Sequence, residues 1–261
     1  MEAYNHTPFF TYPQMKSILY YLLVFLLLYG CQSESKLTFE PHTFKSDSCA
    51  ECPEVSIAIP KALGPAKISK TINVALEEEI ISLLSFDDEL EVTSLEDALK
   101  SFKSGYLELQ QLYDDEPTGW EAKIEGSISY EDANFITIIL DSYLFTGGAH
   151  GYTSKQFLNF DKKKGIELDN DELFKNTDDF RMFAEEMFRE KEKIPKDKSI
   201  NHTGFMFEQD SFYLPENIGF TQKGMTLLYN PYEVASYADG AIELVLPHED
   251  IKKYLAKKPK S

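Results

Sequence analysis

The spacing of apolar residues changes period several times along this chain. Between residues 66 and 84 they recur every three or four positions, which predicts a helix with one buried face. A second helix is expected to begin at Ser94, because Asp97 follows three residues later in a variant of the capping box. A third helix is predicted over residues 177–193, which end before Pro195.

The segments between these helices have the period of strands. Residues 120–131 alternate between apolar and polar, which predicts one packed face and one face in water. Residues 135–145 are apolar at nearly every position and are expected to form a central strand covered on both sides. Shorter strands are predicted at residues 55–60, 152–161, 166–168, 212–214, 218–220, 225–229 and 242–246. This order predicts an α+β fold, with antiparallel sheets, packed helices and two small α+β subdomains.

Residues 1–30 have the pattern of a secretion signal. Their apolar run, residues 18–29, is shorter than the ~20 residues needed to cross a bilayer. The sequence LYGC at residues 28–31 is similar to a bacterial lipobox, although a lipobox usually has a small residue at the second position, where Tyr29 stands here. We therefore expect a lipoprotein signal peptide, with Cys31 as the lipidated residue and Met15 as the true start. A plain signal peptide or a short membrane anchor is the alternative.

Residues 31–53 are polar and without period, and they are expected to form a tether between the lipid and the fold. Cys49 and Cys52 lie in this segment, in the sequence CAEC. In an oxidising envelope a local disulfide is the simplest interpretation of the pair. A thioredoxin-like redox motif would need a strand before it and a helix after it, whereas Pro53 follows here.

The formal net charge of −18 restricts the class of partner. Binding to nucleic acid or to anionic lipid headgroups needs a basic face, so membrane contact is expected only through the N-terminal lipid. The charge favours a cationic partner, or it only keeps the protein soluble. The histidines have neither the HxxxH nor the HExxH spacing of a metal site, so we expect no metal and no cofactor.

The stretch TGGAHG, residues 146–151, follows the long apolar strand. A phosphate-binding loop would be followed by a helix, whereas strand-like residues follow here. We interpret the stretch as a turn in which at least one glycine has a positive φ angle. His150 is expected to make a structural contact, either with Asp141 on the preceding strand, because a buried carboxylate needs a partner, or with a backbone group. Ligand recognition and catalysis are alternative roles for His150.

Two stretches carry a family resemblance. Residues 145–174, FTGGAHGYTSKQFLNFDKKKGIELDNDELF, and residues 229–240, YNPYEVASYADG, together resemble the signatures of a bacterial envelope family. That family joins a PdaC-type N-terminal domain, here residues 54–165, to an RsiV-type C-terminal domain, here residues 166–256. In the family the C-terminal module forms the extracellular part of an anti-sigma factor that senses lysozyme. The N-terminal module precedes the catalytic domain of certain peptidoglycan deacetylases.

This chain departs from both functional types, because we expect neither a cytoplasmic sigma-binding part nor a deacetylase domain. The resemblance therefore implies a lipid-anchored, non-enzymatic binding module of the cell envelope, facing the periplasm or the outside. Its expected partner is cell-wall glycan or a cationic wall-acting protein such as lysozyme. A hydrolase of wall carbohydrate, which would need paired carboxylates, and a purely structural lipoprotein are the alternatives.

Candidate binding residues lie in the same two stretches. Tyr232, Glu233 and Tyr237 have polar tips and lie between two turn signals, on irregular backbone where binding residues are common. His150 and Tyr152 complete the expected site. The alternative for residues 230–240 is that they only lock a crossover between strands.

The lipoprotein interpretation predicts the location of a Cys31→Ser variant. Without the thiol that accepts the lipid, the protein should move from the membrane fraction to the soluble periplasmic or secreted fraction. Fractionation followed by immunoblotting measures this, and unchanged fractionation would contradict the prediction.

Overall fold

The computed structural model describes residues 36–46, 52–86, 92–112 and 119–260. The expected signal peptide, Cys31 and Cys49 lie outside these residues. Cys52 is disulfide-bonded, and its pairing with Cys49 stays a prediction. Over the described ranges, no helix is long and apolar enough to cross a membrane.

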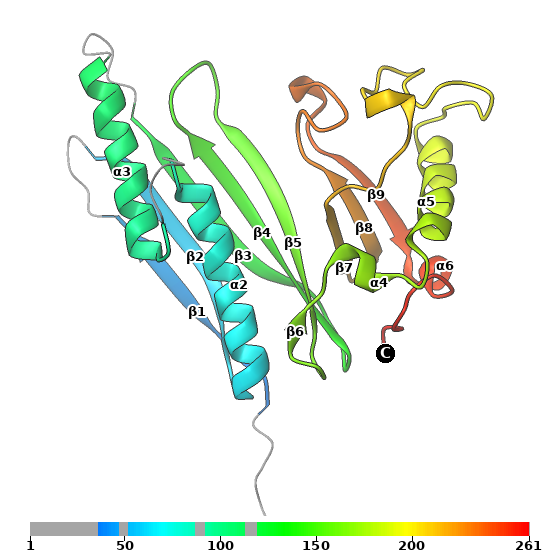
Figure 1. The fold of residues 1–261 in the computed structure, drawn as a ribbon, viewed down its shortest axis with the longest axis horizontal. Helices are drawn as coiled ribbons and strands as arrows, with labels where there is room; N and C mark the ends of the chain where they lie inside the picture. The colour runs from blue at the N-terminus through cyan, green and yellow to red at the C-terminus, as the bar shows by residue number, and fades with distance from the viewer. Residues whose placement is uncertain (1–35, 47–51, 87–91, 113–118, 261) are drawn as a thin grey trace, which may run out of the picture. The chain divides into compact units, whose positions relative to one another are not determined.

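Six strands form a sheet in which they lie in chain order. They are β1 (Thr38–Lys45), β2 (Glu54–Leu63), β3 (Glu121–Glu131), β4 (Phe135–Phe145), β5 (Tyr152–Asp161) and β6 (Ile166–Glu167). Helices α2 (Ala66–Leu84) and α3 (Leu95–Leu112) cover one face of this sheet (Figure 1). The apolar side of α2 is buried there, and Ser94 caps α3 by accepting a hydrogen bond from the Asp97 amide at 3.2 Å.

The sheet is mixed, which corrects the expectation of antiparallel sheets. Strand β2 pairs parallel to β3, from Glu54 opposite Glu121 to Ala58 opposite Glu125. Helices α2 and α3 form the crossover that a parallel pair requires. The other pairs in the sheet are antiparallel, and the predicted α+β class is confirmed.

The expected tether over residues 31–53 is wrong for residues 38–45, which form β1. This strand pairs with β2 along its whole length, from Thr38 opposite Leu63 to Lys45 opposite Ser56. Most of its side chains are exposed because β1 is an edge strand. Only Phe39 and Phe44 of this strand pack against the core. Because they are five residues apart, the segment shows no apolar alternation and its sequence looks like a linker.

A second sheet of three antiparallel strands follows in the chain. Its strands are β7 (Asn217–Thr221), β8 (Gly224–Tyr229) and β9 (Ile242–Pro247), and its helices are α4 (Asn170–Leu173), α5 (Thr177–Lys191) and α6 (His248–Ile251). The strand predicted at residues 212–214 is wrong: the segment is irregular, and Phe212 is buried in the core beside α5. Its apolar residues reflect burial of a loop rather than strand pairing.

The two sheets are joined through β7, which packs on the face of β3, β4 and β5 opposite α2 and α3. Ser129 Oγ donates to the Phe220 carbonyl at 2.9 Å, and Asn159 Nδ2 donates to the Ile218 carbonyl at 2.7 Å. Tyr130 belongs to the core of the second sheet although it lies on β3. On the sheet face that α2 and α3 do not cover, the polar side chains of Ser129 and Asn159 are therefore bonded to the backbone of β7.

Gly219 tests this contact, because a Cβ there would lie 2.3 Å from ring carbons of Phe157. We expect Gly219→Ala to destabilise the fold by about 1–3 kcal/mol through overpacking between β7 and β5. The control is Gly119→Ala, since no heavy atom of another described residue lies within 4 Å of a Cβ at Gly119. Urea denaturation measures both variants, and equal stability of the two would contradict the packing described here.

Candidate functional site

The glycine-rich stretch is a turn between β4 and β5, as predicted. Gly147 and Gly148 have φ angles of 101° and 90°, which confirms the expected positive φ. Gly151 instead lies tightly against the Tyr143 ring, where a Cβ would come within 2.4 Å of a ring carbon. The turn therefore needs glycine for two different reasons.

The segment of residues 230–240 lies against this turn, although about 80 residues separate them in sequence. Tyr237 Oη donates to the Gly151 carbonyl at 2.8 Å, and Tyr152 Oη donates to the Pro231 carbonyl at 3.4 Å. The two stretches that carry the family resemblance, and with them the candidate binding residues, therefore lie in contact with each other.

Three rings form a stack at this place. The His150 and Tyr237 rings are 4.0 Å apart at their centroids and inclined by 15°, and Tyr237 stacks on Tyr232 at 5.3 Å and 30°. We call these three residues the aromatic stack. His150 is exposed and Tyr232 is 57% exposed, so the outer rings face solvent. Tyr232 is held with a φ of 72°, a conformation that is uncommon for residues other than glycine.

Of the two structural contacts expected for His150, the one with Asp141 is not formed and the one with the backbone is. His150 Nδ1 lies 3.0 Å from the Gly151 carbonyl, and Asp141 forms an ion pair with Lys155 at 3.7 Å. Asp141 lies directly opposite Lys155 in the β4–β5 register and is about half exposed. Its carboxylate therefore has both a neighbouring cation and water, and it does not need the histidine.

Asn230 fastens the segment to β5. Its Oδ1 accepts from the Lys155 amide at 2.9 Å, and its Nδ2 donates to the Lys155 carbonyl at 3.0 Å. The backbone N–H of Asn230 in turn donates to Glu233 Oε2 at 2.8 Å. Burial raises the pKa of the Glu233 carboxyl, while this hydrogen bond opposes the rise and nearby Glu216 adds to it. Glu233, expected as a binding residue, thus has a local structural partner.

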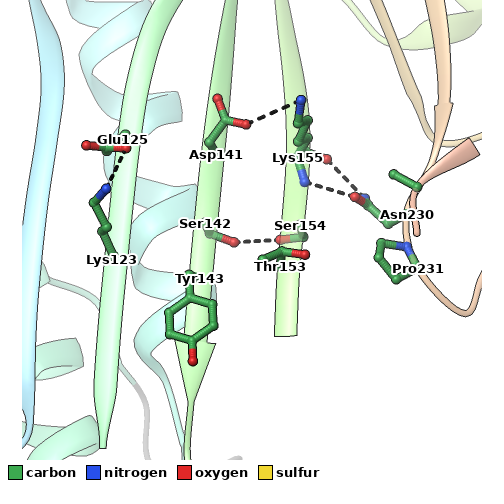
Figure 2. Close-up of a pocket in the computed structure, with 11 residues that line it drawn as sticks. Lys123, Glu125, Asp141, Ser142, Tyr143, Thr153, Ser154, Lys155, Asn230 and Pro231 are labelled. Atoms are coloured by element: carbon green, nitrogen blue, oxygen red, sulfur yellow. Dashed lines mark hydrogen bonds and ion pairs between the residues drawn. The ribbon is translucent and has the colours of Figure 1, made fainter. Parts of the chain in front are cut away.

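A groove of about 380 Å³ opens between β4, β5 and Asn230 (Figure 2). Its lining residue Pro231 directly precedes Tyr232 of the aromatic stack. Its lining comes from β3, β4, β5 and residues 230–241, and includes Lys123, Glu125, Asp141, Tyr143, Thr153, Lys155, Asn230 and Pro231. The charged groups are arranged in ion pairs: Lys123 with Glu125 at 3.0 Å, and Lys155 with Asp141 at 3.7 Å. These pairs place donors and acceptors next to each other on this face of the sheet.

Sequence reasoning missed the groove, although its polar residues left a signal. Lys123 and Glu125 are the polar positions of the alternating strand, and Asp141 interrupts an apolar one. Alternation shows that such residues share a face, but only the strand register shows that Glu125 lies opposite Asp141 and Asp141 opposite Lys155. Within the described ranges, no group of three or more His, Cys, Asp or Glu residues could hold a metal ion.

Comparisons with known proteins agree with this two-part architecture. Residues 46–153 match the family model described as Deacetylase PdaC, and residues 163–249 match the model described as a protein of unknown function (DUF3298). The PdaC-type domain expected from the sequence is therefore found, and the RsiV-type character of the second region stays a prediction. Among curated proteins no match is found.

Solved structures with the same fold are DUF3298 family proteins. A crystal structure from Bacteroides fragilis NCTC 9343 has a TM-score of 0.64 and 18% identity, and covers 87% of this chain and 96% of its own. One from Pseudomonas aeruginosa PAO1 has a TM-score of 0.58 and 20% identity, and covers 87% of this chain and 97% of its own. At these identities the likeness shows the fold alone.

An Asn230→Asp variant tests the attachment of the segment to β5. The new carboxylate oxygen would face the Lys155 carbonyl where Nδ2 now donates, so we expect a loss of about 1–3 kcal/mol in stability. The control is Asn176→Asp, because only the side-chain oxygen of Asn176 is used to cap α5. Chemical denaturation should separate the two variants, and equal stability would show that the second hydrogen bond contributes nothing.

A separate acidic cluster makes stability depend on pH. Burial, and then Glu79, Glu78 and Asp169, raise the pKa of Glu167 on β6 to about 7. Between pH 4.5 and 7 the folded state therefore holds more protons than the unfolded state, and stability falls as pH rises. We expect Glu167→Gln to raise the melting temperature at pH 8 but to change it little at pH 5. The shift should be a few degrees at most, because the Glu167 side chain is only partly desolvated and solvent screens its charge.

The control for this variant is Glu190→Gln, which removes an exposed carboxylate from α5. It should leave the pH dependence unchanged. An identical pH profile for the Glu167→Gln variant and the wild-type protein would contradict the assignment of the cluster.

Proposed function

We propose that this protein is a lipid-anchored, non-enzymatic binding module of the bacterial envelope that recognises cell-wall glycan in the groove and on the aromatic stack. The family models matched by the two regions fit an envelope module. The observation that carries the proposal is a set of exposed stacked rings that adjoins, through Pro231 and Tyr232, a groove lined by paired charged groups.

The chemistry of a sugar chain suits this combination. A sugar ring has hydroxyl groups around its rim and an apolar face of C–H bonds, so its recognition needs convergent donors and acceptors together with a flat apolar surface. Donors and acceptors are offered by the charged side chains of the groove, which are Lys123, Glu125, Asp141 and Lys155. The flat apolar surface is offered by the solvent-facing ring of Tyr232. The ion pairs bring acidic and basic side chains together in the groove, so donors and acceptors lie next to each other for a ligand with several hydroxyl groups.

A hydrolase of wall carbohydrate is the first rival. Glu125 and Asp141 lie opposite each other on neighbouring strands, which is close enough for a pair of carboxylates to act together. Each carboxylate, however, is about half exposed and paired with a lysine. A site with this much water around both groups favours reversible binding over bond cleavage.

A cationic wall-acting protein such as lysozyme is the second rival, supported by the net charge of −18. Charge of this kind acts mainly on the rate of association, and salt screens it over about 8 Å at physiological ionic strength. A glycan bound by hydrogen bonds and ring contacts should depend much less on salt. Salt dependence therefore separates the two partners.

The proposal predicts that the full chain sediments with purified peptidoglycan at physiological salt. Tyr232→Ala should weaken this binding by about tenfold, because an outer ring of the stack is lost. The control is Met182→Ala, which removes an equally exposed apolar side chain from α5. Lysozyme binding that disappears as salt rises, together with no sedimentation on peptidoglycan, would instead support the cationic partner. Release of soluble sugar from the pellet would support the hydrolase.

A further inference from the structure

One row of polar side chains crosses five strands of the first sheet. The strand pairings place Lys45 of β1 opposite Ser56 of β2, and Ser56 opposite Lys123 of β3. They continue from Lys123 to Tyr143 of β4, and from Tyr143 to Thr153 of β5. Residues directly opposite each other project from the same face of a sheet, so these five side chains form a line across the strands. We call this line the transverse row.

The transverse row lies on the sheet face that α2 and α3 do not cover. Ile57 and Ala122, which are the next residues along β2 and β3, are buried in the core that these helices share with the sheet. Successive residues of a strand point to opposite faces, so Ser56 and Lys123 point away from the helices. Figure 2 shows the part of the row on β3, β4 and β5.

Two hollows follow the transverse row. The groove described above contains the part of the row on β3, β4 and β5. A second hollow of about 320 Å³ contains the other end, where its lining includes Lys45, Ser56 and Lys123. Because Lys123 lines both hollows, the two meet at this residue. From β1 to β5 they extend over four strand spacings, which is about 19 Å.

Every side chain of the transverse row can donate a hydrogen bond, and none is acidic. Lys123 pairs with Glu125 at 3.0 Å. The polar groups of the other four side chains have no hydrogen bond or ion pair to any residue that the structure describes. In a chain with a net charge of −18, a line of donors along a groove indicates a ligand that presents acceptor oxygens at intervals along its length.

We propose that the transverse row binds a linear glycan chain laid across the strands, so that β1 and β2 form the end of the binding site farthest from the aromatic stack. This inference rests on the glycan-binding function proposed above. A sugar chain repeats hydroxyl and ring oxygens along its length, and these oxygens can accept from donors arranged in a line. Strand addition of a peptide instead uses the backbone at a sheet edge, whereas the row consists of side chains on a sheet face.

A second row borders the first and supplies acceptors. Ala58, Glu125, Asp141 and Lys155 lie opposite one another in the same strand registers, two residues away from the transverse row on each strand. A sugar hydroxyl both donates and accepts, so it can bond a donor of one row and a carboxylate of the other. The small side chain of Ala58 leaves space for the chain above β2.

The length of the ligand tests the inference on the full wild-type chain. Calorimetric titration compares the trimer and the hexamer of β-1,4-linked N-acetylglucosamine, as short and long models of wall glycan. The trimer is expected to occupy the groove beside Asn230, whereas the hexamer can also reach β2 and β1. We expect the hexamer to bind at least about tenfold more tightly, because side chains at that end add hydrogen bonds. In amide NMR spectra, Lys45 and Ser56 should shift with the hexamer and not with the trimer.

A double variant tests the far end of the row. Lys45→Ala with Ser56→Ala removes both of its donors and should reduce the hexamer's advantage by about fivefold or more, while the trimer binds as before. The control is Lys103→Ala with Ser104→Ala, which removes the same two exposed residue types from α3 on the other face of the sheet. A hexamer also contains more overlapping trimers, but this statistical advantage is the same for every variant. Melting temperatures show whether the variants fold, and the NMR comparison uses the wild-type protein alone.

The possible failures have different meanings. Equal affinity for trimer and hexamer in the wild-type protein would overturn the transverse row and leave glycan binding in place. An unchanged advantage of the hexamer in the folded double variant would overturn the role of β1 and β2. Loss of trimer binding in that variant would contradict the placement of the trimer beside Asn230. If neither oligomer binds and the full chain does not sediment with peptidoglycan, both proposals are wrong.

Discussion

The two hydrogen bonds between the Asn230 side chain and the Lys155 backbone are the interaction on which the site depends. A strand edge without a neighbour leaves peptide groups that must be bonded to protein or to water. By bonding both backbone groups of Lys155, Asn230 attaches the start of the 230–240 segment to β5. Tyr237 then reaches Gly151, and the aromatic stack is built on the turn between β4 and β5.

The same solution occurs on β2. This strand pairs with β3 only as far as Ala58. Beyond that point Asn73 on α2 accepts from the Ala62 amide at 2.8 Å and donates to its carbonyl at 3.0 Å. An asparagine side chain imitates one peptide group of a neighbouring strand, so it can end a ladder without a further strand. On β2 the amide attaches a helix to its own sheet, whereas on β5 it attaches the second region to the first.

Local sequence patterns predicted the regular elements well and the site only in part. Helix α2 and strands β4 and β5 have the predicted bounds, because each buries a face whose period is visible in the sequence. Strand β1 was missed since its only partly buried apolar residues, Phe39 and Phe44, do not alternate with polar ones. The candidate residues His150, Tyr232 and Tyr237 do lie together, yet Asp141 was assigned the wrong partner. Its true partner, Lys155, is set by the register between strands, which a local pattern does not contain.

The backbone around the aromatic stack carries strain that fold stability alone does not require. Tyr232 has a φ of 72° although glycine would adopt this angle without cost, and its ring is 57% exposed. A non-glycine residue in this region costs of order 1 kcal/mol and gains little from burial here. The contacts on either side, Asn230 to β5 and Tyr237 to Gly151, hold the chain in this conformation. An exposed aromatic ring on constrained backbone is more useful for contact with a ligand than for packing, because its orientation is fixed before the ligand binds.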